Sequence, residues 1–249
     1  MSKVLSVSIV LLLLATAASA DWDPGDGHKM HWPQLPDING WDVAATATSP
    51  AGGEAVVRHV ADDWKCSESG PVLDIHFWGS WQDGDAGVIE GFTITIYADI
   101  PANQSPTDYS MPGSVLWGPE YISLDYFEEY HILPNPEAWA GWSAPLSGHE
   151  NCRDHNEYFQ YDINDIAGIP GIAAPFVQTE GAIYWLEIAA DVQDDGVSRR
   201  WGWKSSNRHF NDDAVSNDAG AAAPSWQELL VPDLGAIYNA FHVAVDQIG

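Results

Sequence analysis

Residues 73–81 form the stretch that most constrains the fold of this chain. Apolar residues and one glycine alternate there with mostly polar residues, in the order Leu73, Asp74, Ile75, His76, Phe77, Trp78, Gly79, Ser80, Trp81. A period of two predicts a β-strand with one face against a core and the other face uncovered. Gly70-Pro71, just before this strand, favours a turn.

Similar patterns recur along the chain. Further strands are expected at 55–61, 92–99, 115–117, 121–124, 158–163, 183–192, 201–203, 226–230 and 241–245. Proline, glycine and polar residues predict long loops over 101–113, 134–156 and 211–224. No stretch predicts a helix longer than a turn or two. The sequence therefore predicts an all-β fold, an antiparallel β-sandwich of jelly-roll type with long Pro/Gly-rich loops.

The N-terminus predicts export. Lys3 supplies a positive charge, 9–14 is an apolar run, and Ala18-Ser19-Ala20 has the small residues of a cleavage site. Residues 1–20 are thus expected to be a signal peptide, with Asp21 as the first mature residue. The apolar run is too short to span a membrane, and no later segment is a candidate. The expected location is secreted, extracellular or at the cell surface.

The mature chain is expected to have two parts. Residues 21–53 are rich in Pro, Gly and Asp and contain Trp22, Trp32 and Trp41. They predict an extended arm with little regular structure that packs its tryptophans onto the body. Residues 54–249 are expected to form a single β-sandwich domain.

The charge excludes one class of partner. The chain has a formal net charge of −27, with 36 acidic residues against 9 Lys and Arg. Binding to nucleic acid or to an anionic membrane needs clustered cations, so neither is expected. The acidity is interpreted as a device for solubility, and a Ca²⁺ site is the second interpretation because Ca²⁺ takes six to eight oxygen ligands. No cofactor is required by the sequence.

Cys66 and Cys152 are the two cysteines of the chain. In an exported protein two cysteines predict one disulfide. A zinc site with two cysteine ligands is the alternative.

No signature of a known enzyme class is present: there is no G-x-S-x-G, H-E-x-x-H or P-loop. His28 and His31 are three residues apart, which alone is a weak indication of a metal site. A pair of carboxylates could serve glycoside hydrolysis, but with 36 acidic residues the spacing along the sequence does not select one.

Two tryptophans are candidates for sugar binding. Trp78 and Trp185 lie on the more polar faces of their strands, where an open ring could stack on a pyranose. Asp74 and His76 on one strand, and Glu187 on the other, could then bond to sugar hydroxyls. The alternative is that both rings are covered and belong to a core.

Aspartates near strand ends are the candidates for Ca²⁺. They are Asp62, Asp63, Asp212 and Asp213, with Asp99 as a further ligand. The alternative is that one Asp of each adjacent pair turns inward and accepts hydrogen bonds from the backbone.

Several phrases of the sequence resemble a known family. They are His31-Trp32-Pro33-Gln34-Leu35-Pro36-Asp37, Ala61-Asp62-Asp63-Trp64-Lys65-Cys66, Ile75-His76-Phe77-Trp78-Gly79-Ser80-Trp81, Ala98-Asp99-Ile100-Pro101-Ala102, Ser110-Met111-Pro112-Gly113, Leu116-Trp117, Gly202-Trp203-Lys204-Ser205-Ser206, Asn211-Asp212-Asp213-Ala214-Val215 and Trp226-Gln227-Glu228-Leu229. The chain is similar, over nearly all its mature length, to an uncharacterised secreted bacterial domain of unknown function. The resemblance implies a secreted β-rich module and no catalytic activity.

Three functions follow as hypotheses. The first is an exported, non-catalytic module that binds polysaccharide or a cell-surface or matrix protein. The second is a secreted glycan-active hydrolase with an acidic pair. The third is a structural, self-assembling extracellular protein, which an exposed hydrophobic edge strand would favour.

Overall fold

The computed structural model describes residues 30, 33–47, 58–132, 137–144, 149–208, 210–218, 226–230, 242–243 and 245–248. Within these ranges the chain forms β-strands and short 3₁₀ turns, and no α-helix. The predicted all-β sandwich is confirmed. The signal peptide, Asp21, Trp22, His28, His31 and Trp32 lie outside the described residues. In the described part, no helix is long and apolar enough to cross a membrane.

One layer is a nine-stranded sheet in the order β7-β10-β4-β13-β1-β8-β9, to which β16 adds beside β13 and β17 beside β4. Its strands are β1 (Trp41–Ala44), β4 (Ile75–Trp81), β7 (Glu128–Ile132), β8 (Ala140–Ala144), β9 (His149–His155), β10 (Tyr158–Ile163), β13 (Trp201–Ser206), β16 (His242–Val243) and β17 (Val245–Ile248). The pairs are antiparallel except β1 with β8, which is parallel.

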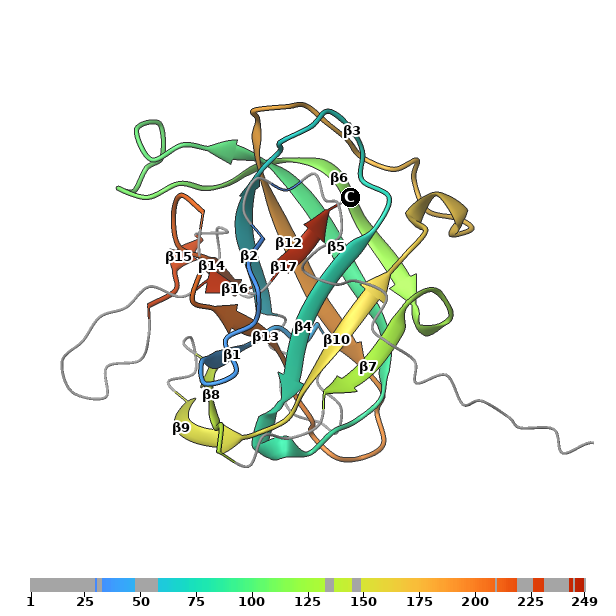
Figure 1. Ribbon diagram of the computed structural model, residues 1–249, viewed down its shortest axis with the longest axis vertical. Helices are drawn as coiled ribbons and strands as arrows, with labels where there is room; N and C mark the ends of the chain where they lie inside the picture. Colours follow the sequence, from blue (N-terminus) through green and yellow to red (C-terminus); the bar gives the residue numbers. More distant parts are fainter. Residues whose placement is uncertain are drawn as a thin grey trace, which may run out of the picture.

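The other layer is a six-stranded sheet in the order β15-β14-β2-β12-β5-β6, with antiparallel pairs throughout. Its strands are β2 (Arg58–Lys65), β5 (Ile89–Ile100), β6 (Met111–Ser123), β12 (Ile183–Val192), β14 (Val215–Asp218) and β15 (Gln227–Glu228). A two-stranded ribbon, β3 (Gly70–Pro71) with β11 (Val177–Gln178), closes one end. Figure 1 shows β4 and β10 in front of β5 and β12, so the two sheets face each other.

The core between the sheets is aromatic. Phe77 of β4 meets the edge of Phe92 from β5, with ring centroids 4.9 Å apart. Trp201 of β13 packs on Phe92 at 5.4 Å, and its Nε1–H donates to the hydroxyl of Tyr161 at 3.2 Å. Edge-to-face contacts of this kind add to the stability that buried area provides. The core therefore joins β4, β10 and β13 of one sheet to β5 of the other.

Gly79 explains why a glycine interrupts the apolar positions of β4. A Cβ at this residue would lie 2.3 Å from the ring of Trp201, so the Trp201 ring occupies the space of the missing side chain. Glycine within a strand often marks such a close approach.

The expected strand at 73–81 is partly corrected. β4 begins at Ile75, and Leu73 lies outside it with 39% of its surface exposed, whereas Ile75 and Phe77 are fully buried. The expected open face is wrong, because every residue of β4 is buried on both faces. The polar residues of this strand are buried because other side chains satisfy their hydrogen bonds, as described below.

The segment predicted to be an N-terminal arm contains a strand. β1 lies inside the nine-stranded sheet, between β13 and β8, and its Asp42 and Val43 are buried. Trp41 packs against the core, as expected. Four residues are too short for alternation to reveal a strand, and the partners of β1 are far away in sequence.

Segments expected to be loops contain further strands. β8 and β9 lie within 134–156, and β14 lies within 211–224. The two short strands expected at 115–117 and 121–124 are parts of the single strand β6, whose pairing with β5 shifts register three times. Those irregularities remove the even alternation that a sequence pattern needs.

The predicted disulfide is absent. No disulfide joins Cys66 to Cys152; Cys66 is buried and Cys152 is exposed. Cys66 follows β2, where its thiol donates to the carbonyl of Glu68 at 3.0 Å, and Cys152 lies on β9. The link from β2 to β3 and strand β9 lie at opposite ends of the molecule (Figure 1), so the two sulfur atoms are too far apart to bond.

Candidate functional site

A pocket opens where the chain passes from the six-stranded to the nine-stranded sheet. The 3₁₀ turn η2 (Leu124–Tyr126) makes this crossing, and a second turn, η4 (Ile166–Gly168), follows β10. The pocket, called the η2 pocket below, has a volume of about 230 Å³. It is lined by Asp125, Tyr126, Phe127, Glu128, Asp162, Asn164, Asp165, Gly168 and Ile169.

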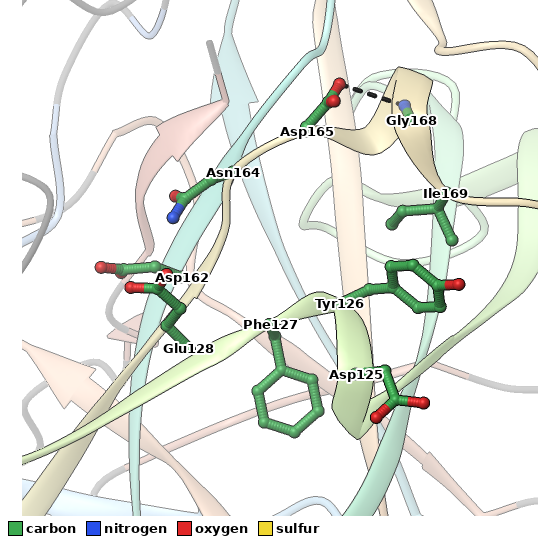
Figure 2. A pocket seen from close by; sticks show the side chains of 9 residues that line it. All are labelled: Asp125, Tyr126, Phe127, Glu128, Asp162, Asn164, Asp165, Gly168 and Ile169. Atoms are coloured by element: carbon green, nitrogen blue, oxygen red, sulfur yellow. Dashed lines mark hydrogen bonds between the residues drawn. The ribbon is translucent and has the colours of Figure 1, made fainter.

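The polar and apolar side chains of the η2 pocket are segregated. Figure 2 shows Glu128, Asp162 and Asn164 gathered on one side, and Tyr126 with Ile169 on the other. Asp165 caps η4 by accepting a hydrogen bond from the backbone N–H of Gly168 at 3.0 Å. Tyr126 is 40% exposed, so part of its ring is open to solvent. The pocket therefore offers carboxylate and amide groups beside an accessible aromatic ring.

Glu128 and Asp162 are direct cross-strand neighbours. They face each other in the register of β7 and β10, so their side chains lie on the same face of the sheet. Glu128 is exposed and accepts a hydrogen bond from the hydroxyl of Tyr130, two residues along the same strand. Asp162 is fully buried, so the pair has one accessible and one enclosed carboxylate.

Neighbouring side chains satisfy the buried carboxylate of Asp162. His76 of β4 is its partner in the register on the other side, and its Nδ1 lies 2.8 Å from Oδ1 of Asp162. The amide of Gln160 donates to the same carboxylate at 2.9 and 3.2 Å. Of the residues predicted to bind a ligand, His76 thus supports the η2 pocket through Asp162.

Trp78 has no open face. It is 4% exposed and packs against Leu35 and Tyr158. Asp74 lies before β4 and is partly buried, and within the described part of the chain its Oδ1 has no hydrogen-bond partner. The sugar-stacking role predicted for Trp78 requires an exposed ring, and the ring of Trp78 is buried.

Trp185 and Glu187 lie on the outer face of the other sheet, away from His76 and Trp78. Trp185 is fully buried, and its Nε1–H donates to Oδ1 of Asp99 at 2.9 Å. Glu187 is also buried and bonds to Nδ1 of His59 and to the hydroxyl of Tyr97. Burial and the charge of Glu187 raise the pKa of Tyr97. The predicted ligand-binding residues thus form two separate groups, one on each sheet.

The predicted Ca²⁺ ligands gather only in part. Asp63, Asp99 and Asp212 lie near one another, and each binds a neutral donor, respectively Asn211, Trp185 and Ser110. Asp62 points to the opposite face of β2 and accepts hydrogen bonds from the amide of Gln34 and from the backbone N–H of Asp63, both at 2.9 Å. The hydrogen bond from the backbone N–H of Asp63 to Asp62 agrees with the alternative that one aspartate of the pair accepts hydrogen bonds from the backbone.

The acidic cluster of Asp63, Asp99 and Asp212 has a clear electrostatic consequence. Burial, then the charge of Asp62, and to a smaller degree Asp99 and Asp212, raise the pKa of Asp63 well above its usual value, against the hydrogen bond from Asn211. Asp213 lies near Glu228, whose pKa is raised by burial first and then by Asp213. Among the described residues, no group of three or more His, Cys, Asp or Glu could hold a metal ion. Calcium binding therefore stays a prediction.

One buried polar network has no counterpart among the residues predicted from the sequence. Lys204, Asp42, His155, Asp154 and Ser80 form a buried network in the nine-stranded sheet. Lys204 belongs to the segment Gly202-Trp203-Lys204-Ser205-Ser206 that carries the family resemblance, and Asp42 belongs to the expected arm. The register of β1 with β13 brings them together, which no local pattern indicates.

Comparison with known proteins gives a family without an activity. Residues 30–246 match one protein-family model, which is described as a domain of unknown function (DUF7901). No curated protein and no solved structure matches the chain.

Proposed function

We propose that this member of the DUF7901 family of domains of unknown function is an exported, non-catalytic β-sandwich module that binds carbohydrate in the η2 pocket. The observation that carries this proposal is the composition of the pocket. It combines the carboxylates of Asp125, Glu128 and Asp165, the amide of Asn164 and the exposed ring of Tyr126. Binding sites for small polar ligands commonly join a few convergent polar groups to an apolar wall.

The chemistry of a sugar fits this arrangement. Sugar hydroxyls donate to carboxylates and both donate to and accept from an amide, so Glu128 and Asn164 can bind neighbouring hydroxyls. The flat ring of Tyr126 can cover the apolar face of a pyranose. His76 and Gln160 hold Asp162 in place beneath Glu128, which keeps this wall of the pocket rigid. A pocket of about 230 Å³ suits one or two sugar rings rather than a long chain.

The direct test is a glycan array with the mature chain and a matched pair of variants. Tyr126→Ala and Asn164→Ala are expected to weaken binding at least tenfold, since each removes a contact inside the pocket. Tyr121→Ala is the control, because Tyr121 is a tyrosine of similar exposure on β6 outside the pocket. Absence of any glycan binding, or equal losses for Tyr126→Ala and Tyr121→Ala, would contradict the proposal.

A glycan-active hydrolase is the second candidate, because Glu128 and Asp162 face each other in the register of β7 and β10. Side chains directly opposite in an antiparallel pair are about 4.5–5.5 Å apart at Cβ, a spacing from which two carboxyl groups can reach the separation of about 5–5.5 Å found in retaining glycosidases. Hydrolysis of a bound glycan by the wild type, abolished in Glu128→Gln, would favour this function over simple binding.

The self-assembling alternative has less support. β6 is an exposed edge strand with apolar residues such as Val115 and Leu116 on its surface. The same strand contains Pro112 and Pro119 and three register shifts against β5. Prolines and bulges are common ways in which edge strands avoid pairing with other chains. A monomer at high concentration is therefore the expected state, measurable by light scattering.

A further inference from the structure

Lys204 and Asp42 form a fully buried ion pair between adjacent strands. They are partners in the register of β13 and β1, and Nζ of Lys204 lies 2.9 Å from Oδ2 of Asp42. Their side chains are 1% and 0% exposed. Lysine is almost never buried to this degree without a special partner, and the desolvation of both charges is costly.

The surroundings of this pair are buried and aromatic. Trp142 is fully buried, faces Asp42 in the register of β8 with β1, and places its ring over Gly202, near Lys204 on β13. The ring of Tyr158 lies 5.7 Å from Nζ of Lys204. Oδ1 of Asp42 has no hydrogen-bond partner among the residues that the structure describes. An enclosed amine and carboxyl that are held in contact have lost the water that would otherwise separate them.

A histidine is in place to move protons at this pair. Nε2 of His155 lies 3.0 Å from Oδ2 of Asp42 and 2.7 Å from the hydroxyl of Ser80, while its Nδ1 lies 2.9 Å from Oδ2 of Asp154. Burial alone would lower the pKa of His155, but Asp42 and Asp154 outweigh it and raise this pKa to about 9. At neutral pH His155 is therefore a proton donor to the oxygen that Lys204 also contacts.

We propose that Lys204 and Asp42 condense to an intramolecular isopeptide bond, which links β13 covalently to β1. Lys204 first passes one proton to Asp42, which gives a neutral amine and a carboxylic acid. The amine lone pair then forms a C–N bond to Cγ, and the C–O bond to Oδ2 breaks. Oδ2 leaves as water with the acid proton and one amine proton relayed through His155, and Oδ1 remains as the amide oxygen.

The charges of the network favour this condensation. Lys204 and His155 balance Asp42 and Asp154 before the reaction, and His155 with Asp154 remains balanced after it. A neutral amide replaces two buried charges, which removes most of their desolvation cost. No oxidant, reductant or further reactant is needed. Groups held in contact react with a large effective concentration, and the exclusion of water slows the reverse hydrolysis.

Intact mass spectrometry of the denatured full chain tests the proposal. The wild type is expected to be lighter by one water molecule than the mass calculated from its sequence. The same loss is expected for Lys65→Arg, the matched control at a partly buried lysine of β2. Lys204→Arg and Asp42→Ala are expected to keep their full sequence masses. Proteolysis of the wild type should give a branched peptide that joins the segments of Asp42 and Lys204. A wild type at its full mass, or a loss of water in Lys204→Arg as well, would overturn the proposal.

Two further variants keep the test independent of a folding failure. Asp42→Asn would lose ammonia instead of water, so its product should converge on the mass of the wild-type product. His155→Gln removes the proton relay and should slow condensation about 10²-fold or more, as for other general acids. An unchanged rate in refolded His155→Gln would overturn the role of His155.

Discussion

The two sheets bury aspartates in opposite ways. In the nine-stranded sheet Asp42 contacts two cations, Lys204 and His155, and despite its burial they lower its pKa. In the six-stranded sheet Asp63 lies near other carboxylates and binds only the neutral amide of Asn211, and its pKa is raised. Burial penalises the charged form in both places, so the partners decide the sign. The comparison shows that the same fold lowers the pKa of one buried carboxyl group and raises the pKa of another.

The largest effect is expected from breaking the balanced network. Lys204→Met leaves Asp42 as a buried carboxylate without its ammonium partner and unable to condense. Compared with the uncondensed wild type, its free energy of unfolding should be lower by about 3–5 kcal/mol. The control Lys65→Met, at a partly buried lysine of β2, should cost much less. Chemical denaturation of both variants gives the comparison. Equal losses would mean that the buried network does not stabilise the nine-stranded sheet.

A smaller gain is expected from neutralising the unbalanced cluster. The raised pKa of Asp63 means that the folded protein holds this proton more tightly than the unfolded chain. The associated stability is present at low pH and is lost as the pH rises through the folded-state pKa. Asp63→Asn cannot ionise, so at neutral pH it should stabilise the protein by about 0.5–2 kcal/mol.

The pH dependence of this gain separates charge from packing. Below the ordinary pKa of 3.8, Asp63 is protonated in the folded and unfolded states, and the advantage of Asp63→Asn should vanish. Asp108→Asn, at an exposed aspartate, serves as the control and should show no such trend. Thermal unfolding between acid and neutral pH measures both. A gain that persists unchanged in acid would show that the charge of Asp63 is not its cause.

The smallest effect is expected at the cysteines, one of which follows β2 of the six-stranded sheet while the other lies on β9 of the nine-stranded sheet. Cys152→Ser should change the free energy of unfolding by less than about 0.5 kcal/mol, because Cys152 is exposed and unpaired. A reducing agent should leave the melting temperature unchanged, and thiol titration of the denatured chain should find both thiols free. A disulfide would instead cost about 2–5 kcal/mol on reduction.

The sequence predicted those parts of the fold whose signal is local. The long alternating run of β12 has the predicted bounds, 183–192, and β10 has its predicted bounds as well. β1 and β8 were missed because four or five residues carry too little periodicity, and their pairing partners are distant in sequence. Secondary structure of that kind is decided by the neighbouring strands, which no local pattern contains.

The candidate site was harder to predict from the sequence for the same reason. His76 and Asp74 were interpreted as an open polar face, but polar side chains on β4 are buried because partners on other strands satisfy them. Glu128 and Asp162 are 34 positions apart in the chain and meet only through the register of β7 with β10. Tyr126 precedes β7 in a turn that has no alternating pattern. The sequence shows that these residues are present, but only the strand register brings them together.

The position of β1 has a consequence for how the molecule can be assembled. The strand comes early in the chain, yet it joins the hairpin of β8 and β9 to β13, which is made more than 150 residues later. The nine-stranded sheet therefore cannot form while the chain is still short, because β1 can pair only after β8 and β13 have been made. Contacts of such long sequence separation slow folding. A truncated chain that begins at Arg58 would lose the middle of a layer, and the hairpin beyond it would be left without a sheet.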